Sequence, residues 1–286
     1  MKSFFLYTLL LVTFTSNALH ASQISQLTFA AWNKPDVKLL FVMPKIIDKN
    51  TEVLFIIHGA SRDVDGYLDL WIESSKEKNV ILVAPHFTKT HFPHYSTLGM
   101  ATHSGNLIKN KDRWLDNSLS NFYSYFKNRY NLETNNYRVF GFSGGSQFTH
   151  RYLMYGNDKK ISRAALGSAG WYTFINNEDF PYGIKDMPLE AGRIEWLMSN
   201  KILFFLGDED NDPNHSSLNT SVGAMNQGSD RYERGLNYFD HLIFIGEKFN
   251  IPFRWNFKSI KGTDHNREIM SKSAMDFMLS DLEYSS

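Results

Sequence analysis

The 286-residue sequence contains no cysteine and no excess of charge of either sign. Without cysteine the chain can form no disulfide and can carry no lipid on an N-terminal cysteine, so its fold depends on an apolar core. Lysine plus arginine number 30, as do aspartate plus glutamate. This balance argues against nucleic acid or an anionic membrane surface as a partner.

Internal repeats, low-complexity tracts and domain linkers are also missing. Hydrophobic residues make up 42% and aromatic residues 15% of the chain, which is sufficient for a sizeable core. We therefore expect residues 22–286 to form a single domain, and no feature of the sequence indicates an obligate protein partner.

The first residues have the layout of a secretory signal peptide. Lys2 precedes the apolar run "FFLYTLLLVTF", and small and polar residues follow it. The run is shorter than the ~20 residues that span a bilayer, which argues against a membrane anchor. We expect residues 1–21 to be a signal peptide, cleaved after Ala18 or Ala21, and the protein to be periplasmic or secreted without stable membrane association.

From about residue 36 the sequence alternates between two patterns. Short runs rich in β-branched and aromatic residues are typical of strands buried on both faces of a parallel sheet, and amphipathic stretches separate most of them. This order predicts an α/β fold, a mostly parallel central sheet flanked by helices on both faces. The first two runs, 37–47 and 51–60, have no helix between them, so we expect an antiparallel pair.

Glycines flank one serine at the point where a predicted strand becomes a predicted helix. The segment Gly141-Phe142-Ser143-Gly144-Gly145 follows the strand-like "YRVF" and precedes the helix-like "SQFTHRYLMYG". Gly-x-Ser-x-Gly in this context is the nucleophile-elbow pattern, in which a sharp turn lifts the serine hydroxyl clear of the sheet. Ser143 is therefore the candidate nucleophile.

A serine hydroxyl needs a base, and the base needs an acid to orient it. His265 follows the last predicted strand, and "DEDND" follows the strand "KILFFLG". We prefer Asp210 as the acid because it completes a Gly-x-x-Asp pattern after the strand. Asp208 is the main alternative, with Asp230 or Asp240 next if neither serves.

The negative charge of an acyl-transfer intermediate needs amide donors. One is expected from Gly144, directly after the nucleophile. The other is expected from Ala60, in the loop "HGASRD" after an earlier strand. We interpret His58 as a packed histidine that shapes this loop rather than as a catalytic group.

With these motifs the chain resembles the α/β-hydrolases, and is most similar to their secreted esterase and polyhydroxyalkanoate-depolymerase-like branch. The resemblance rests on His58-Gly59, the Ser143 elbow, Gly207-to-Asp210 and Gly262-to-His265, and covers residues from about 36 to 284. It implies a serine hydrolase that forms an acyl-enzyme and uses neither metal nor cofactor. The depolymerases often carry cysteine and tryptophan around the oxyanion loop, and this chain has no cysteine.

Two irregular segments are expected near the site. Residues 88–114 should border its mouth. The spacing of His86, His91, His94 and His103 would allow a zinc site, but no clean carboxylate or cysteine partner accompanies them, so no metal is expected. Trp171 and Tyr172 are expected to contact substrate, because they follow a strand at the carboxyl edge of the sheet. For Trp171 the alternative is core packing.

The sequence thus predicts a serine esterase acting on a small-molecule or polymeric ester. Neutral charge and aromatic loops favour an uncharged, partly apolar acyl group. The same triad would serve an amidase, a peptidase or an acyltransferase, and a non-catalytic binding module is a further alternative.

The signal-peptide prediction can be tested directly. Mass spectrometry of exported protein should find a mature N-terminus at Leu19 or Ser22. Recovery of a chain that still begins at Met1 in the soluble extracytoplasmic fraction would contradict it.

Overall fold

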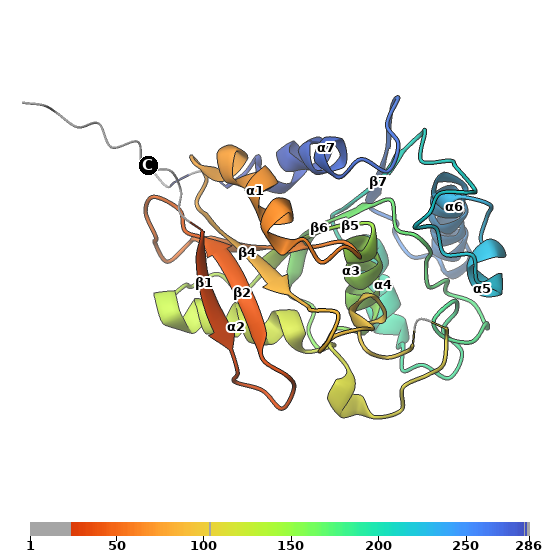
Figure 1. Ribbon diagram of the computed structural model, residues 1–286, viewed down its shortest axis with the longest axis horizontal. Helices are drawn as coiled ribbons and strands as arrows, with labels where there is room; N and C mark the ends of the chain where they lie inside the picture. The colour runs from red at the N-terminus through yellow and green to blue at the C-terminus, as the bar shows by residue number, and fades with distance from the viewer. Residues whose placement is uncertain (1–23, 103, 283, 285–286) are drawn as a thin grey trace, which may run out of the picture.

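The computed structural model describes residues 24–102, 104–282 and 284, so the expected signal peptide lies outside the described residues. Within them, eight strands form one sheet in the order β1-β2-β4-β3-β5-β6-β7-β8 (Figure 1). The strands are β1 Ser25–Phe29, β2 Val37–Val42, β3 Glu52–Ile57, β4 Val80–His86, β5 Tyr137–Phe142, β6 Ile161–Gly167, β7 Ile202–Gly207 and β8 Trp255–Ile260.

The sheet is mostly parallel, as predicted, but the predicted antiparallel pair is wrong. Strand β2 pairs antiparallel with β1 and with β4, whereas β3 lies parallel between β4 and β5. The partner that the sequence analysis missed is β1, whose residues are only partly buried in alternation because it is an edge strand. A search for continuous apolar runs detects strands buried on both faces and overlooks such an edge.

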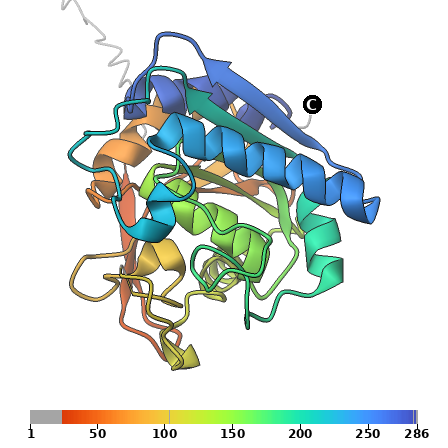
Figure 2. The ribbon, with the colours of Figure 1, turned by 90° about the vertical axis from the view of Figure 1, so that its right-hand side faces the viewer.

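Helices cover both faces of the sheet (Figures 1 and 2). Helices α1 and α7 lie on one face, and α2, α3, α4 and α6 lie on the other. The helices are α1 Val64–Ser75, α2 Ser118–Tyr130, α3 Gly144–Tyr155, α4 Ala191–Ser199, α5 Val222–Met225, α6 Arg231–Phe249 and α7 Arg267–Leu279, with short 3-10 turns η1 Tyr95–Thr97 and η2 Lys111–Arg113. Among the described residues, no helix has the length and apolar character needed to cross a membrane.

Alternate side chains of the inner strands enter two separate apolar layers. In β3, Val53, Phe55 and Ile57 pack into the layer with α2 and α3, and Leu54 and Ile56 pack into the layer with α1 and α7. All five side chains are fully buried. Because successive residues of a strand point to opposite faces, a strand covered on both sides must be apolar throughout.

The parallel strands also bring the predicted site residues to one place. Strand β3 ends just before His58, β5 just before Ser143, β7 shortly before Asp210 and β8 shortly before His265. Parallel strands end at the same edge of a sheet, where ligands bind in open α/β folds. Residues that are distant in sequence therefore meet at this carboxyl edge.

Two histidines near this edge are fully buried. In each, Nδ1 donates to a carbonyl oxygen and Nε2 accepts from a backbone amide, which defines a neutral ring. The partners are Gly59 O and Phe87 N for His58, and Ser146 O and Thr173 N for His150. Burial lowers the pKa of His58 to about 3 and that of His150 well below its ordinary value.

These buried histidines predict a loss of stability in mild acid. Both bind a proton in the unfolded chain near its ordinary pKa of ~6.5 but stay neutral in the folded chain, so the unfolded state gains protons as pH falls. Together they should lower the free energy of unfolding by roughly 2–3 kcal/mol between pH 7.5 and 5.5. Urea titrations at the two pH values measure this difference.

An exposed histidine provides the control for that measurement. His91 is exposed, so His91→Gln should show the same loss as the unaltered protein. Equal or greater stability at pH 5.5 than at pH 7.5 would show that neither His58 nor His150 is held neutral by the fold.

Candidate active site

Ser143 occupies a sharp turn between β5 and α3. Its φ is +56°, in the left-handed region that side chains rarely adopt. The flanking glycines make the turn possible, because a Cβ on Gly145 would lie 2.1 Å from the Ile57 carbonyl oxygen and one on Gly141 would lie 2.3 Å from the Gly145 carbonyl oxygen. The close packing of β3, β5 and α3 thus explains why the motif needs glycine at both positions.

His265 reaches Ser143 from the loop between β8 and α7. Its Nε2 lies 2.9 Å from Ser143 Oγ, and its Nδ1 lies 2.6 Å from Asp210 Oδ2. With the proton on Nδ1, the ring donates to Asp210 and accepts from the Ser143 hydroxyl. Burial lowers the pKa of His265 below its ordinary value, against the opposing effect of Asp210. The imidazole is therefore neutral near pH 7 and able to take up a proton.

The structure brings Asp210, rather than Asp208, to His265. Asp210 lies beyond Gly207, the last residue of β7, and only 4% of its surface is exposed. Asp208 points elsewhere, since its Oδ1 accepts from the Gly262 amide at 2.7 Å. That bond ties the end of β7 to the turn after β8, so Asp208 has a structural partner of its own.

Arg231 is a site residue that the sequence analysis did not identify. Its Nη1 donates to Asp210 Oδ1 at 3.1 Å, and its side chain is 2% exposed. Asp230, one of the alternative acids, instead caps the N-terminus of α6, and Asp240 is exposed farther along that helix. In the sequence Arg231 is simply a basic residue beside a helix cap, a pattern common on surfaces, so no signal distinguished it.

The two expected amide donors lie side by side. A Cβ on Gly144 would lie 2.9 Å from the Ala60 nitrogen. The carbonyl oxygen of Gly59 accepts from His58 Nδ1 and from the Arg62 amide. Since the peptide unit is planar and trans, the Ala60 N–H must point away from those two donors. The Gly144 amide is the first of helix α3 and has no acceptor within the helix.

A pocket of about 320 Å³ lies beside Ser143, and we call it the Ser143 pocket. Ala60 and Gly144 line it, as does Trp171, which was predicted to contact substrate. Arg62 and Arg231 also line it, and no aspartate or glutamate does so among the described residues. Arg231 is paired with the Asp210 carboxylate, so its charge is balanced. Arg62 adds a positive charge to the wall, and its guanidinium donates to backbone carbonyl oxygens of residues 87, 92 and 93.

The structure corrects the prediction for Tyr172. Its side chain is fully buried and stacks on Tyr238 of α6, with ring centroids 4.5 Å apart and planes 12° apart. It does not line the Ser143 pocket. Of these two consecutive residues, Trp171 lines the pocket and Tyr172 packs beneath α6.

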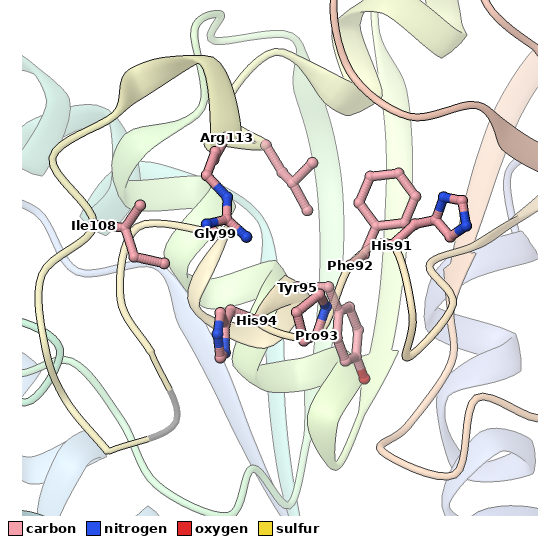
Figure 3. Close-up of a pocket in the computed structure, with 9 residues that line it drawn as sticks. His91, Phe92, Pro93, His94, Tyr95, Gly99, Ile108 and Arg113 are labelled. Atoms are coloured by element: carbon pink, nitrogen blue, oxygen red, sulfur yellow. The ribbon is translucent and has the colours of Figure 1, made fainter.

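The histidine-rich loop borders the pocket, as predicted. Pro93, Tyr95 and Ser96 belong to its wall. A second, smaller cavity of about 30 Å³ lies within the same loop, and Figure 3 shows the imidazoles of His91 and His94 on opposite sides of the segment that lines it. In the described part of the chain, which omits His103, no three histidine, aspartate or glutamate side chains are grouped to hold a metal ion.

No protein-family model matches the chain, and no curated protein sequence matches it. Several solved structures are similar to it. Poly(aspartic acid) hydrolase-1 from Sphingomonas sp. KT-1 shares 28% sequence identity at a TM-score of 0.83, with 89% of this chain and 98% of that chain covered. A poly(3-hydroxybutyrate) depolymerase from Bordetella parapertussis shares 21% identity at a TM-score of 0.81, with 93% and 92% covered.

A more distant likeness is to a siderophore hydrolase from Aspergillus nidulans, at 13% identity and a TM-score of 0.55, covering 97% of this chain and 99% of that one. These likenesses confirm the predicted α/β-hydrolase fold and, in structure, the resemblance to its esterase and depolymerase-like branch. Because the neighbours are hydrolases, they support hydrolase activity for this chain.

The contacts of the two aspartates predict different effects of substitution. Asp210→Asn should lower kcat for p-nitrophenyl acetate strongly, by up to ~10⁴-fold, because the amide no longer holds His265 in the required tautomer. Asp208→Asn should lower kcat much less, since it only weakens the turn after β8. Circular dichroism should show both variants folded. The opposite ranking of the two variants would show that Asp210 is not the acid.

Proposed function

We propose that the chain is a serine hydrolase that cleaves carboxylic esters through Ser143, His265 and Asp210. The observation that carries this proposal is the unbroken series of hydrogen bonds from the Ser143 hydroxyl through His265 to Asp210, at the wall of a pocket. It supplies what a serine needs for attack on a carbonyl: a neutral base within reach and a buried acid behind it.

In the first half of the proposed reaction, Ser143 Oγ attacks the ester carbonyl carbon as its proton passes to His265 Nε2. The amides of Ala60 and Gly144 stabilise the charge on the carbonyl oxygen. The intermediate then breaks its bond to the leaving oxygen, which takes the proton from His265 and departs as an alcohol. An acyl group remains on Ser143.

In the second half, a water molecule gives a proton to His265 and attacks the acyl carbonyl. The new intermediate expels Ser143 Oγ, which recovers the proton from His265, and the carboxylic acid leaves. Asp210 stays ionised throughout and stabilises the imidazolium that forms in each half. No step calls for a metal ion or cofactor.

Removal of the nucleophile tests this function. Ser143→Ala should lower kcat for p-nitrophenyl esters by several orders of magnitude, because triad members act as a unit. A panel of esters and aminoacyl amides, assayed with the unaltered protein and with Ser143→Ala, measures both the loss and the preferred bond. Ester hydrolysis that persists in Ser143→Ala would overturn the proposal.

A second candidate is hydrolysis of amides in an acidic polymer. It is favoured by Arg62, a half-buried arginine of the Ser143 pocket, and by the absence of carboxylates from the described lining. The charge of Arg231, which also lines the pocket, is balanced by Asp210. One structural neighbour is named as a poly(aspartic acid) hydrolase. The same triad chemistry serves both bonds, so the two candidates differ in the substrate that the pocket binds.

The charge of the substrate tests the second candidate. If Arg62 attracts anions, a p-nitrophenyl ester with a terminal carboxylate should show a lower KM than a neutral ester of similar length. That advantage should shrink as salt is raised, because exposed charges are screened. Release of new amino groups from poly(aspartic acid) measures amide cleavage directly. A neutral ester favoured at every ionic strength would rule out an anionic preference.

A further inference from the structure

The carboxylate of Asp210 is shared between two partners. Its Oδ2 contacts His265 Nδ1 at 2.6 Å, and its Oδ1 accepts from Arg231 Nη1 at 3.1 Å. The side chains of Asp210 and Arg231 are 3% and 2% exposed. A second contact reinforces the pair, since the amide of Tyr232 donates to the Asp210 carbonyl oxygen at 3.1 Å.

The same guanidinium also holds the wall of the Ser143 pocket. Arg231 Nη2 donates to Ser217 Oγ at 2.8 Å and lies 3.4 Å from His215 Nδ1. Residues 216–219 line the pocket. One side chain therefore connects the proposed acid to a loop that lines the Ser143 pocket.

The groups that act on the charge of His265 can be named from each element around it. Asp210 comes from the loop after β7, Arg231 from α6, and His215 from the loop that leads to α5. Asp210 favours a charged ring, whereas Arg231 and His215 oppose it. The ring of His215 lies 5.9 Å from that of His265. Tyr172 is the further titratable group near Asp210.

We infer that Arg231 is a positioning residue for the proposed hydrolysis: it fixes the Asp210 carboxylate against His265, places a positive charge beside that pair, and holds residues 216–219 at the wall of the Ser143 pocket. This inference rests on the proposed function. A guanidinium suits this task because its planar set of donors can bind two acceptors in fixed directions, whereas an ammonium group is a single point charge.

The experiment compares Arg231→Met with Arg231→Lys by the pH dependence of kcat/KM for p-nitrophenyl acetate. The acid limb of this pH profile, where kcat/KM falls as the pH is lowered, reports protonation of the base in the free enzyme, here His265. Arg231→Met removes a positive charge near His265, so the limb should move to higher pH, by roughly 0.5–1 unit. Arg231→Lys keeps the charge, so its limb should stay near that of the unaltered protein while kcat falls.

Two further variants separate positioning from a general structural effect. Ser217→Ala removes the contact to the pocket wall and should raise KM without moving the acid limb. Arg254→Met removes an exposed arginine at the opposite end of β8 and should change neither kcat, KM nor the limb. If Arg231→Met does not fold, Arg231→Lys and Ser217→Ala still distinguish the two contacts of Arg231. The first variant should lower kcat, and the second should raise KM.

The outcomes distinguish this inference from the function on which it rests. An inactive Ser143→Ala with an unmoved acid limb in Arg231→Met would overturn the role of Arg231 alone. A limb that moves equally in Arg231→Lys and Arg231→Met would also overturn it, because charge would not be the cause. Ester hydrolysis by Ser143→Ala would overturn the proposed function itself.

Discussion

The site exists because β5, β7 and β8 run parallel and end at one edge of the sheet. Ser143 and His265 are 122 residues apart, and Asp210 and His265 are 55 apart, yet their side chains are within hydrogen-bonding distance. The close approach of β3 to α3 requires glycine around Ser143 and sets Ala60 beside Gly144. The position of every proposed reactive group thus follows from the packing of this edge.

Buried charge is the second feature of the site. Asp210 is almost inaccessible to solvent, and a buried carboxylate is costly unless it is paired and hydrogen-bonded. Asp210 has two partners here: its Oδ2 contacts His265, and its Oδ1 accepts from Arg231. The pairing with Arg231 orients the Asp210 carboxylate, while burial and the nearby arginine lower the pKa of His265. The base is therefore held in the neutral form that the proposed mechanism needs, with the acid oriented toward it.

The sequence allowed prediction of those parts of the fold and site that depend on local pattern. Apolar runs identified the inner strands, and the turn chemistry around Ser143 and the ends of β7 and β8 singled out the three residues that the structure brings together. Edge strand β1 was missed because it is only half-buried. The contact of Arg231 with Asp210 and the stacking of Tyr172 on Tyr238 depend on the packing of α6 against distant loops. No local sequence pattern indicates such packing.

The central claim is that Ser143 is activated as a nucleophile by His265. Labelling with a fluorophosphonate, followed by peptide mapping, tests it most directly, because the probe reacts only with an activated hydroxyl. The account predicts one adduct per chain, on the peptide that contains "GFSGG", and no adduct in His265→Ala or Ser143→Ala. An adduct on another residue, or labelling that persists in Ser143→Ala, would contradict it.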